Sequence, residues 1–246
     1  MHYKKLILLG AIMFQGLCGF GESTNQNTLE TYLKRLEQDD SFFTRIPKKI
    51  IWLSGAPGAG KGTNTQTIIE NAHLYKEPVV VSSLLKTPEM REKINKGILI
   101  DDEVVVKVLF AELQKPIYQQ GIVIDGFPRK EGQAKCIEWL YQNLKARNLN
   151  PQFSVITLMV SEEESVKRQL HRGQLAQQQA NGKEEVRATD LDPELVRNRY
   201  KTFMKETYSA LQLLEKKIPF VTIDASGSFD EVKQQVLDAL HTLKLM

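Results

Sequence analysis

A glycine-rich segment, residues 55–63, carries the residues of this chain that are best suited to chemistry on phosphate. Its sequence, GAPGAGKGT, has the spacing G-x-x-x-x-G-K of a phosphate-binding loop. Glycines let the backbone approach phosphate with its N–H groups pointing inward, and the N-terminus of a following helix favours anionic oxygens. Lys61 would act as a point charge on the outer phosphates. Gly62 stands where the general motif has Ser or Thr, and the hydroxyl follows one residue later, at Thr63.

A second group of polar residues follows another apolar segment, GIVID at 121–125. Asp125 ends this segment, and a carboxylate in that position beside a phosphate loop is well placed to hold magnesium, directly or through water. Arg129 would leave the next turn as a bidentate phosphate ligand, with Gln133 one helical turn further on. A turn aspartate and a solvated surface arginine would explain each residue singly, but not their occurrence together behind the phosphate loop.

The elements that would position these residues alternate between strand and helix from residue 49 onward. Continuous Val and Ile runs predict buried strands, and the segments between them predict helices. We expect strands at 49–54, 78–83, 121–125, 153–160 and 219–225, and helices at 61–73, 101–114, 130–147, 161–172, 192–217 and 229–243. The prediction is an α/β fold, a five-stranded parallel sheet of the P-loop NTPase type with flanking helices. Ligands bind at the carboxyl ends of such strands, so the loops after the first four strands would face one crevice.

The first 48 residues precede this pattern. Residues 1–22 combine a basic head, an apolar run and small residues near its end, which is the layout of a secretory signal peptide; a peripheral anchor is the alternative. Residues 23–48 form a polar extension with a predicted helix at 28–39, capped by Thr28. Three apolar side chains would attach it to the domain: Phe42, Phe43 and Ile46. Residues 1–22 favour an exported or membrane-associated protein, whereas chemistry on ATP favours the cytoplasm. We expect a membrane contact only through residues 1–22, if they are not cleaved.

Composition narrows the classes of function. The 246 residues suit one large domain (49–246) behind the two N-terminal segments, and 41% hydrophobic residues are enough for a sizeable core. A net charge of +3 gives no indication of nucleic-acid binding. Two cysteines cannot form a disulfide framework or a four-thiolate zinc site, and Cys136 is expected as a small buried side chain in a helix. We expect a monomer, although no pattern in the sequence determines the oligomeric state.

At this point the chain resembles the adenylate kinase family of nucleoside monophosphate kinases, over about residues 48–245. GAPGAGKGT is similar to the family's GxPGxGKGT loop, which accounts for Gly62. DGFPR followed by Gln133 is similar to its DGFPR-xxxQ motif. Arginine-containing segments at 168–172, 187–190 and 197–199 resemble, more loosely, the arginines that border the family's lid. Solvated charge on helix faces is the ordinary alternative for these arginines.

The resemblance implies a role for each matching residue. The ATP-binding residues would be Gly55, Gly58, Ala59, Gly60, Lys61, Gly62 and Thr63, with Arg168 stacked on the donor adenine. The monophosphate-binding residues would be Ser83, Ile100, Arg129 and Gln133. Asp125 would help to hold Mg²⁺, through water. The catalytic set would be Lys61, Arg129, Arg172, Arg187 and Arg199, since phosphoryl transfer needs positioning and charge neutralisation more than covalent help.

The acceptor side departs from the family. Where the family has S-T-G-D-x-L-R, with an arginine for the acceptor phosphate, this chain reads SSLLKTP at 82–88, and the sequence leaves open whether Lys86 or Arg91 supplies the charge. We therefore expect a reduced monophosphate-binding insertion, and a short lid at about 173–188 that lacks cysteines and hence zinc. The predicted function is transfer of the γ-phosphoryl group of ATP to a nucleoside monophosphate, AMP in the leading hypothesis. The alternatives are a UMP/CMP kinase and a nucleotide-binding protein without transferase activity.

Overall fold

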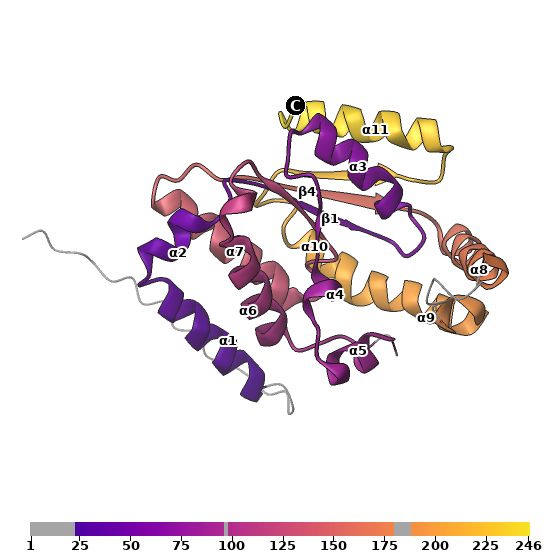
Figure 1. Ribbon diagram of the computed structural model, residues 1–246, viewed down its shortest axis with the longest axis horizontal. Coiled ribbons are helices and arrows are strands. Elements are labelled where there is room, and N and C mark those ends of the chain that lie inside the picture. Colours follow the sequence, from indigo (N-terminus) through magenta and orange to yellow (C-terminus); the bar gives the residue numbers. More distant parts are fainter. Residues whose placement is uncertain (1–22, 96–97, 180–187) are drawn as a thin grey trace, which may run out of the picture.

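The computed structural model describes residues 23–95, 98–179 and 188–246, and all structural statements below concern these residues (Figure 1). The predicted signal peptide or anchor at 1–22 lies outside them, as do Arg187 and much of the predicted lid. Within the described part of the chain, none of the helices has both the length and the apolar character required to cross a membrane.

Five parallel strands form the sheet, as predicted, in the order β2-β3-β1-β4-β5. The strands are β1 (Lys49–Gly55), β2 (Val79–Val80), β3 (Ile122–Asp125), β4 (Gln152–Met159) and β5 (Phe220–Asp224). In the register, Leu53 of β1 lies opposite Asp125 of β3, and Gly55 lies opposite Leu158 of β4. The carboxyl ends of the three central strands therefore meet at one edge of the sheet, where the motifs after β1 and β3 begin.

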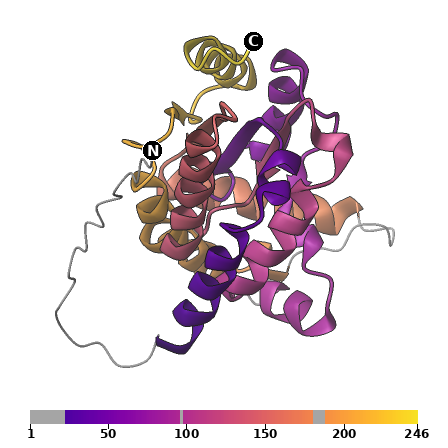
Figure 2. The same ribbon diagram turned by 90° about the vertical axis from the view of Figure 1, so that its left-hand side faces the viewer.

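Helices cover both faces of the sheet (Figures 1 and 2). They are α1 (Ser23–Leu36), α2 (Asp40–Arg45), α3 (Lys61–Asn71), α4 (Val81–Leu84), α5 (Pro88–Asn95), α6 (Asp102–Leu113), α7 (Glu131–Ala146), α8 (Glu162–Gln179), α9 (Pro193–Thr202), α10 (Ser209–Gln212) and α11 (Phe229–Thr242), with short turns η1 (Pro116–Tyr118), η2 (Ala188–Leu191) and η3 (Phe203–Tyr208). Side chains alternate along β1: Ile50 and Trp52 pack with α6 and α7, while Ile51 and Leu53 pack with α3 and α11. This alternation divides the core into two layers, one on each face of the sheet.

The second strand is much shorter than the predicted 78–83. Only Val79 and Val80 pair with β3, opposite Ile124 and Asp125, and β3 ends at Asp125. Beyond this point an edge strand has no partner on either side, and residues 81–84 form α4 instead. The prediction of a strand through Ser83 is therefore wrong. The Val-rich run favours a strand, but the sequence does not reveal that the neighbouring strand β3 ends at Asp125.

Two predicted helix boundaries also change. Helix α8 continues seven residues beyond Arg172, to Gln179. The predicted single helix 192–217 begins at Pro193 but widens into a π-helical turn, η3, and its last helical piece ends at Gln212. Hydrophobic period alone does not reveal such a turn, which often marks a functional region. Here η3 carries Thr207, whose hydroxyl donates to the carbonyl oxygen of Arg129 at 3.1 Å.

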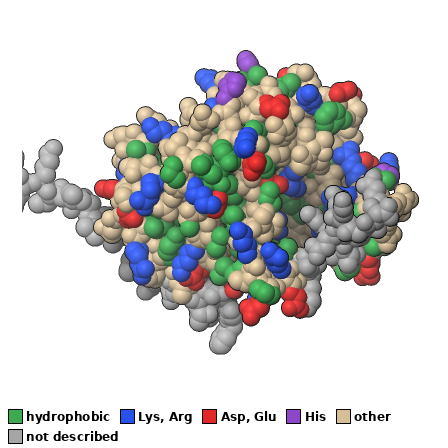
Figure 3. Space-filling model, viewed as in Figure 1, with side chains coloured by type: hydrophobic (Ala, Val, Ile, Leu, Met, Phe, Trp, Pro, Cys, Tyr) green, Lys and Arg blue, Asp and Glu red, His purple; other side chains and the backbone are tan. Residues whose placement is uncertain are grey.

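The N-terminal extension packs as an outer layer over α6 and α7 (Figure 2). The predicted anchors are confirmed: Phe42, Phe43 and Ile46 are buried, with exposed fractions of 1–3%. The predicted cap Thr28 is wrong, because α1 begins at Ser23 and Thr28 lies within it. On the face seen in Figure 3, basic and acidic side chains are interspersed with apolar ones.

Candidate functional site

The loop between β1 and α3 is fixed by close backbone contacts. A Cβ atom on Gly55 would lie 2.6 Å from the carbonyl oxygen of Leu158, so only glycine fits against β4 there. Gly60 precedes α3 with φ +81°, a left-handed conformation that glycine adopts without strain. The chain thus turns sharply into α3, whose first-turn N–H groups have no partners within the helix and can face an anion.

Lys61, the first residue of α3, is the charged centre of the site. Its Nζ donates a hydrogen bond to the carbonyl oxygen of Gly55 at 2.8 Å. Burial lowers the pKa of Lys61 from 10.5 to about 8; the Asp125 carboxylate opposes this effect, and nearby guanidinium groups add to it. These groups belong to Arg129, Arg199 and Arg172. The fold therefore brings five of the charged residues predicted from sequence within electrostatic reach of one another, although they come from four separate segments.

Asp190 links two of these arginines. Its carboxylate accepts a hydrogen bond from Nε of Arg172 at 2.8 Å through one oxygen, and from Nη1 of Arg199 at 2.6 Å through the other. The side chain of Asp190 is only 3% exposed. Gly173 lets α8 approach this point, because a Cβ there would lie 2.4 Å from the carbonyl oxygen of Asp190. A buried carboxylate between two guanidinium groups holds both in place, a role that the sequence analysis did not assign to Asp190.

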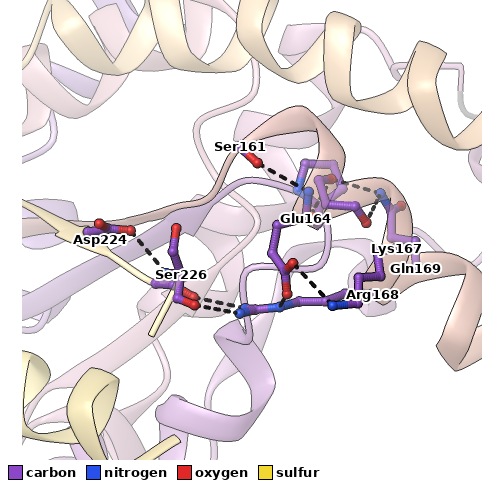
Figure 4. Close-up of polar contacts among 10 residues, drawn as sticks. Ser161, Glu164, Lys167, Arg168, Gln169, Asp224 and Ser226 are labelled. Carbon is purple, nitrogen blue, oxygen red and sulfur yellow. Dashed lines mark hydrogen bonds and ion pairs between the residues drawn. The ribbon is translucent and has the colours of Figure 1, made fainter. Parts of the chain in front are cut away.

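Arg168 lies one turn before Arg172 on α8 and makes different contacts (Figure 4). Its Nε donates to Glu164 at 2.7 Å, and its Nη1 donates to the carbonyl oxygen of Ala225 at 2.9 Å. Nη2 donates to the carbonyl oxygen of Ser226 at 3.4 Å. The guanidinium plane is thus tied to the turn after β5, beside the phosphate loop and apart from the arginine pair at Asp190.

A buried polar pair on α8 supports the phosphate loop from behind. The Oγ of Ser165 donates to the carbonyl oxygen of Pro57 at 2.7 Å, and it accepts from Nε2 of Gln169 at 3.0 Å. Both side chains are fully buried. This pair was not predicted from the sequence. Two polar residues four apart on a helix share one face, and this spacing was the only sign of the pair.

A second part of the site is a cavity of about 30 Å³ between α4, α5, the start of α6 and the loop after β3. Three predicted monophosphate-binding residues, Ile100, Arg129 and Gln133, line it together. The serine that lines it is Ser82, whereas Ser83 is exposed, so the structure does not bring Ser83 to the other three. The cavity has room for one or two water molecules, which is much less than a nucleotide base fills, so a base would lie within it after the surrounding helices moved apart.

Gln133 is the most constrained residue of this cavity, with an exposed fraction of 3%. Its Oε1 accepts the backbone N–H of Arg129 at 2.8 Å, and its Nε2 donates to Oδ1 of Asp102 at 2.8 Å. The Nε of Arg129 donates to the carbonyl oxygen of Gly126 at 3.1 Å, which holds the guanidinium over the turn after β3. The contact between Asp102 and Gln133 was not predicted from the sequence.

Asp125, the predicted metal residue, ends β3 within reach of Lys61. In the part of the chain that the structure describes, three or more His, Cys, Asp or Glu side chains do not come together in a group that could hold a metal. Cys136 is buried as predicted, and burial raises the pKa of its thiol to about 12. Among the described residues, Asp125 therefore lies near Lys61 without belonging to a protein-only metal cage.

Comparison with known proteins adds an independent line of evidence. The family model described as adenylate kinase matches residues 53–218. Three similar proteins are adenylate kinases from Azobacteroides pseudotrichonymphae (30% identical over 203 residues, covering 78% of this chain and 97% of the relative), Thermosipho africanus (28% over 212 residues, 76% and 97%) and Acetivibrio thermocellus (29% over 218 residues, 78% and 98%). The matches span nearly the full length of these relatives, and the family match contains both predicted motifs.

Proposed function

This chain belongs to the adenylate kinase family, and we propose that it transfers the γ-phosphoryl group of ATP to AMP with formation of two ADP. It is a nucleoside monophosphate kinase, and the choice of AMP follows what its relatives are named for. The observation that carries the proposal is the place of Arg129. This residue lines the small cavity and also contributes to the electric field at Lys61, so one cation connects the phosphate loop with the cavity.

On the donor side, we propose that the loop residues from Gly55 to Thr63 hold the ATP phosphates. Arg172 and Arg199, fixed by Asp190, would neutralise the charge that spreads over the transferring phosphoryl group. Arg168 would contact the adenine, because its guanidinium lies beside the turn after β5. We also propose a catalytic role for Arg187, as the resemblance implies; this residue lies outside the described residues.

On the acceptor side, Arg129 would bind the AMP phosphate and Gln133 the base, with Ile100 and a serine lining the pocket. The structure favours Ser82 for this serine over the predicted Ser83. The cavity must widen for AMP to enter, and α5 is the short outer helix whose movement would open it. The missing acceptor-site arginine is replaced by Lys86 or Arg91, and that choice stays open.

Magnesium suits this site although the described residues do not form a protein-only metal cage. Mg²⁺ commonly binds one or two carboxylates together with substrate phosphates and keeps several of its waters. Asp125 faces the phosphate loop closely enough to affect Lys61, which fits this mode of binding. When bound, Mg²⁺ would neutralise charge on the ATP phosphates, while the protein's own cations orient them.

A coupled assay of ADP production with AMP, CMP and UMP tests the proposal. We expect AMP to give the highest kcat/KM. A higher value for CMP or UMP would identify a UMP/CMP kinase, which the short lid also suits. Tight ATP binding without turnover of any monophosphate would instead identify a nucleotide-binding protein without transferase activity.

We propose that the catalytic domain comprises residues 49–246, preceded by the docked extension 23–48. Residues 1–22 keep their two predicted roles, a cleaved signal peptide or a peripheral anchor. N-terminal sequencing of the natural protein distinguishes these roles, because a chain that begins near residue 23 has lost the segment and one that begins at Met1 has kept it.

A further inference from the structure

The amide of Gln133 is held from both ends, and this fixes its orientation. The backbone N–H of Arg129 contacts Oε1 and the Asp102 carboxylate contacts Nε2, each at 2.8 Å. A backbone N–H can only donate a hydrogen bond, and a carboxylate can only accept one. The reversed amide would place donor against donor at one end and acceptor against acceptor at the other. Gln133 therefore has one orientation while both partners are present.

The fold makes a specific space for the Asp102 carboxylate. Asp102 begins α6, whereas Gln133 lies in α7, so the contact joins two helices across the wall of the cavity. Next to Gln133 is Gly132, where a Cβ atom would lie 2.3 Å from Oδ2 of Asp102. Any larger residue at position 132 would displace the carboxylate. Glycine in the first turn of α7 thus allows Asp102 to reach the amide.

A fixed amide can distinguish bases that a rotating amide cannot. After its contacts with Arg129 and Asp102, Gln133 keeps one N–H on Nε2 and one lone pair on Oε1. Adenine presents a ring nitrogen acceptor, N1, beside an amino donor, N6, and this pair complements the remaining donor and acceptor. Hypoxanthine, the base of IMP, presents N1–H and O6 at the same two places, so donor would face donor and acceptor would face acceptor.

We propose that Asp102 sets the selectivity for the acceptor base by locking the Gln133 amide, so that bases with an amino group are accepted over their oxo counterparts. This inference rests on the proposed transfer to AMP. Asp102 is a positioning residue, because it acts through Gln133 rather than on the nucleotide. Without Asp102, only the backbone N–H of Arg129 would favour this orientation, and the reversed amide, which pairs with the oxo base, would become accessible.

The test compares AMP with IMP as acceptors, because the two differ only at positions 1 and 6 of the purine. In the full-length protein we expect Asp102→Ala to lower the ratio of kcat/KM for AMP to that for IMP about tenfold, which corresponds to about one hydrogen bond of discrimination. The KM for ATP should change less than about twofold, because Asp102 bonds Gln133, which we place on the acceptor side. Asp102→Asn should restore only part of the selectivity, because the Asn amide can rotate and donate to Gln133 as well as accept from it.

Gly132→Ala gives an independent route to the same effect, because it displaces the carboxylate while leaving Asp102 in the sequence and favours the helix. Glu103→Ala is the matched control: it removes the next carboxylate of the same helical turn, which pairs with Lys107. Unchanged selectivity in a folded Asp102→Ala or Gly132→Ala variant would overturn the inference, as would equal use of AMP and IMP by the wild-type protein. Failure of the proposed function looks different, since the wild-type protein would then phosphorylate neither monophosphate.

Discussion

The two parts of the candidate site, the loop at 55–63 and the small cavity beside Gln133, are built in different ways. The phosphate loop is one continuous segment, residues 55–63, and its supports are buried groups on the neighbouring β4 and α8, at Leu158 and Ser165. The cavity that we propose as the acceptor site takes its lining from several segments, and its volume is about 30 Å³. A site made of consecutive residues forms wherever its loop folds, whereas a site made of distant residues depends on how whole helices pack.

The N-terminal extension covers the helices on the proposed acceptor side. Helices α6 and α7, which carry Asp102 and Gln133, are covered by the N-terminal extension, and this extension precedes the segment 53–218 that matches the family. The extension contacts α6 at two points. The Nζ of Lys107 lies 5.3 Å from the centroid of the Tyr32 ring, and the ring centroids of Phe110 and Phe42 are 5.6 Å apart. We therefore expect changes at the loop to act mainly on ATP and on chemistry, and changes around α6 and α7 to act mainly on AMP.

The largest expected effect lies at the phosphate loop. Lys61→Met keeps an unbranched side chain of similar length but removes the positive charge at the centre of the site. We expect kcat/KM to fall by at least about a thousandfold, because charge stabilisation supplies most of the catalysis in phosphoryl transfer. The coupled ADP assay measures the loss, and circular dichroism with thermal unfolding checks that the fold is kept. Near-normal turnover in a folded variant would contradict the assignment of Lys61.

The second-largest expected effect should distinguish the proposed acceptor side from the proposed donor side. Arg129→Ala removes the cation that lines the acceptor cavity, and we expect kcat/KM for AMP to fall about a hundredfold through a higher KM and a lower kcat. ATP affinity, measured by calorimetry without AMP, should change less than about threefold, because Lys61 and the loop are intact. Lys135→Ala is the matched control, since it removes a cation on an exposed face of α7, paired with Glu131. A larger loss of ATP affinity than of AMP affinity would remove the distinction between donor and acceptor sides.

The division between the two sides also decides what could be predicted from the sequence. The parallel sheet, its strands and the loop at 55–63 follow local rules, since hydrophobic runs, glycines and the lysine lie within short windows. The predicted acceptor residues Arg129 and Gln133 line one cavity, and both come from the short motif at 125–133. The prediction was wrong where the outcome depended on a distant neighbour: residues 81–84 form a helix because β3 offers no further partner.

The supporting residues were the part of the site that could not be predicted. Asp190, Asp102 and Ser165 each act by contact with a residue far away in sequence, and their own neighbours in the chain give no sign of it. A single buried carboxylate or serine is compatible with a cap, a turn or a solvated face. Only the packing of α8 against η2 and the phosphate loop, and of α6 against α7, identifies what each side chain holds.

A third prediction uses the pKa of Lys61, which burial lowers to about 8 in the unliganded protein. ATP phosphates next to the ammonium group favour its charged form and raise this pKa again. Near pH 8.5 we therefore expect ATP binding to take up part of a proton, and ATP affinity to fall by up to about tenfold per pH unit above this pKa. Calorimetry in buffers of different ionisation enthalpy measures the uptake. AMP binding should take up less, because its phosphate is expected at Arg129, and Lys61→Met should abolish the uptake with ATP.

The smallest expected effect concerns the extension that covers α6 and α7. Glu37 joins it to α7, because its Oε1 accepts the indole N–H of Trp139 at 2.7 Å. Glu37→Ala should lower the free energy of unfolding by about 1.5 kcal/mol, the low end of the usual contribution of a hydrogen bond to a charged group, and raise the KM for AMP about twofold at unchanged KM for ATP. Denaturant unfolding and initial rates measure these changes, and Glu37→Gln, which keeps an acceptor oxygen, is the control. Equal changes in both KM values would mean that the extension stabilises the whole domain and does not act on the acceptor side in particular.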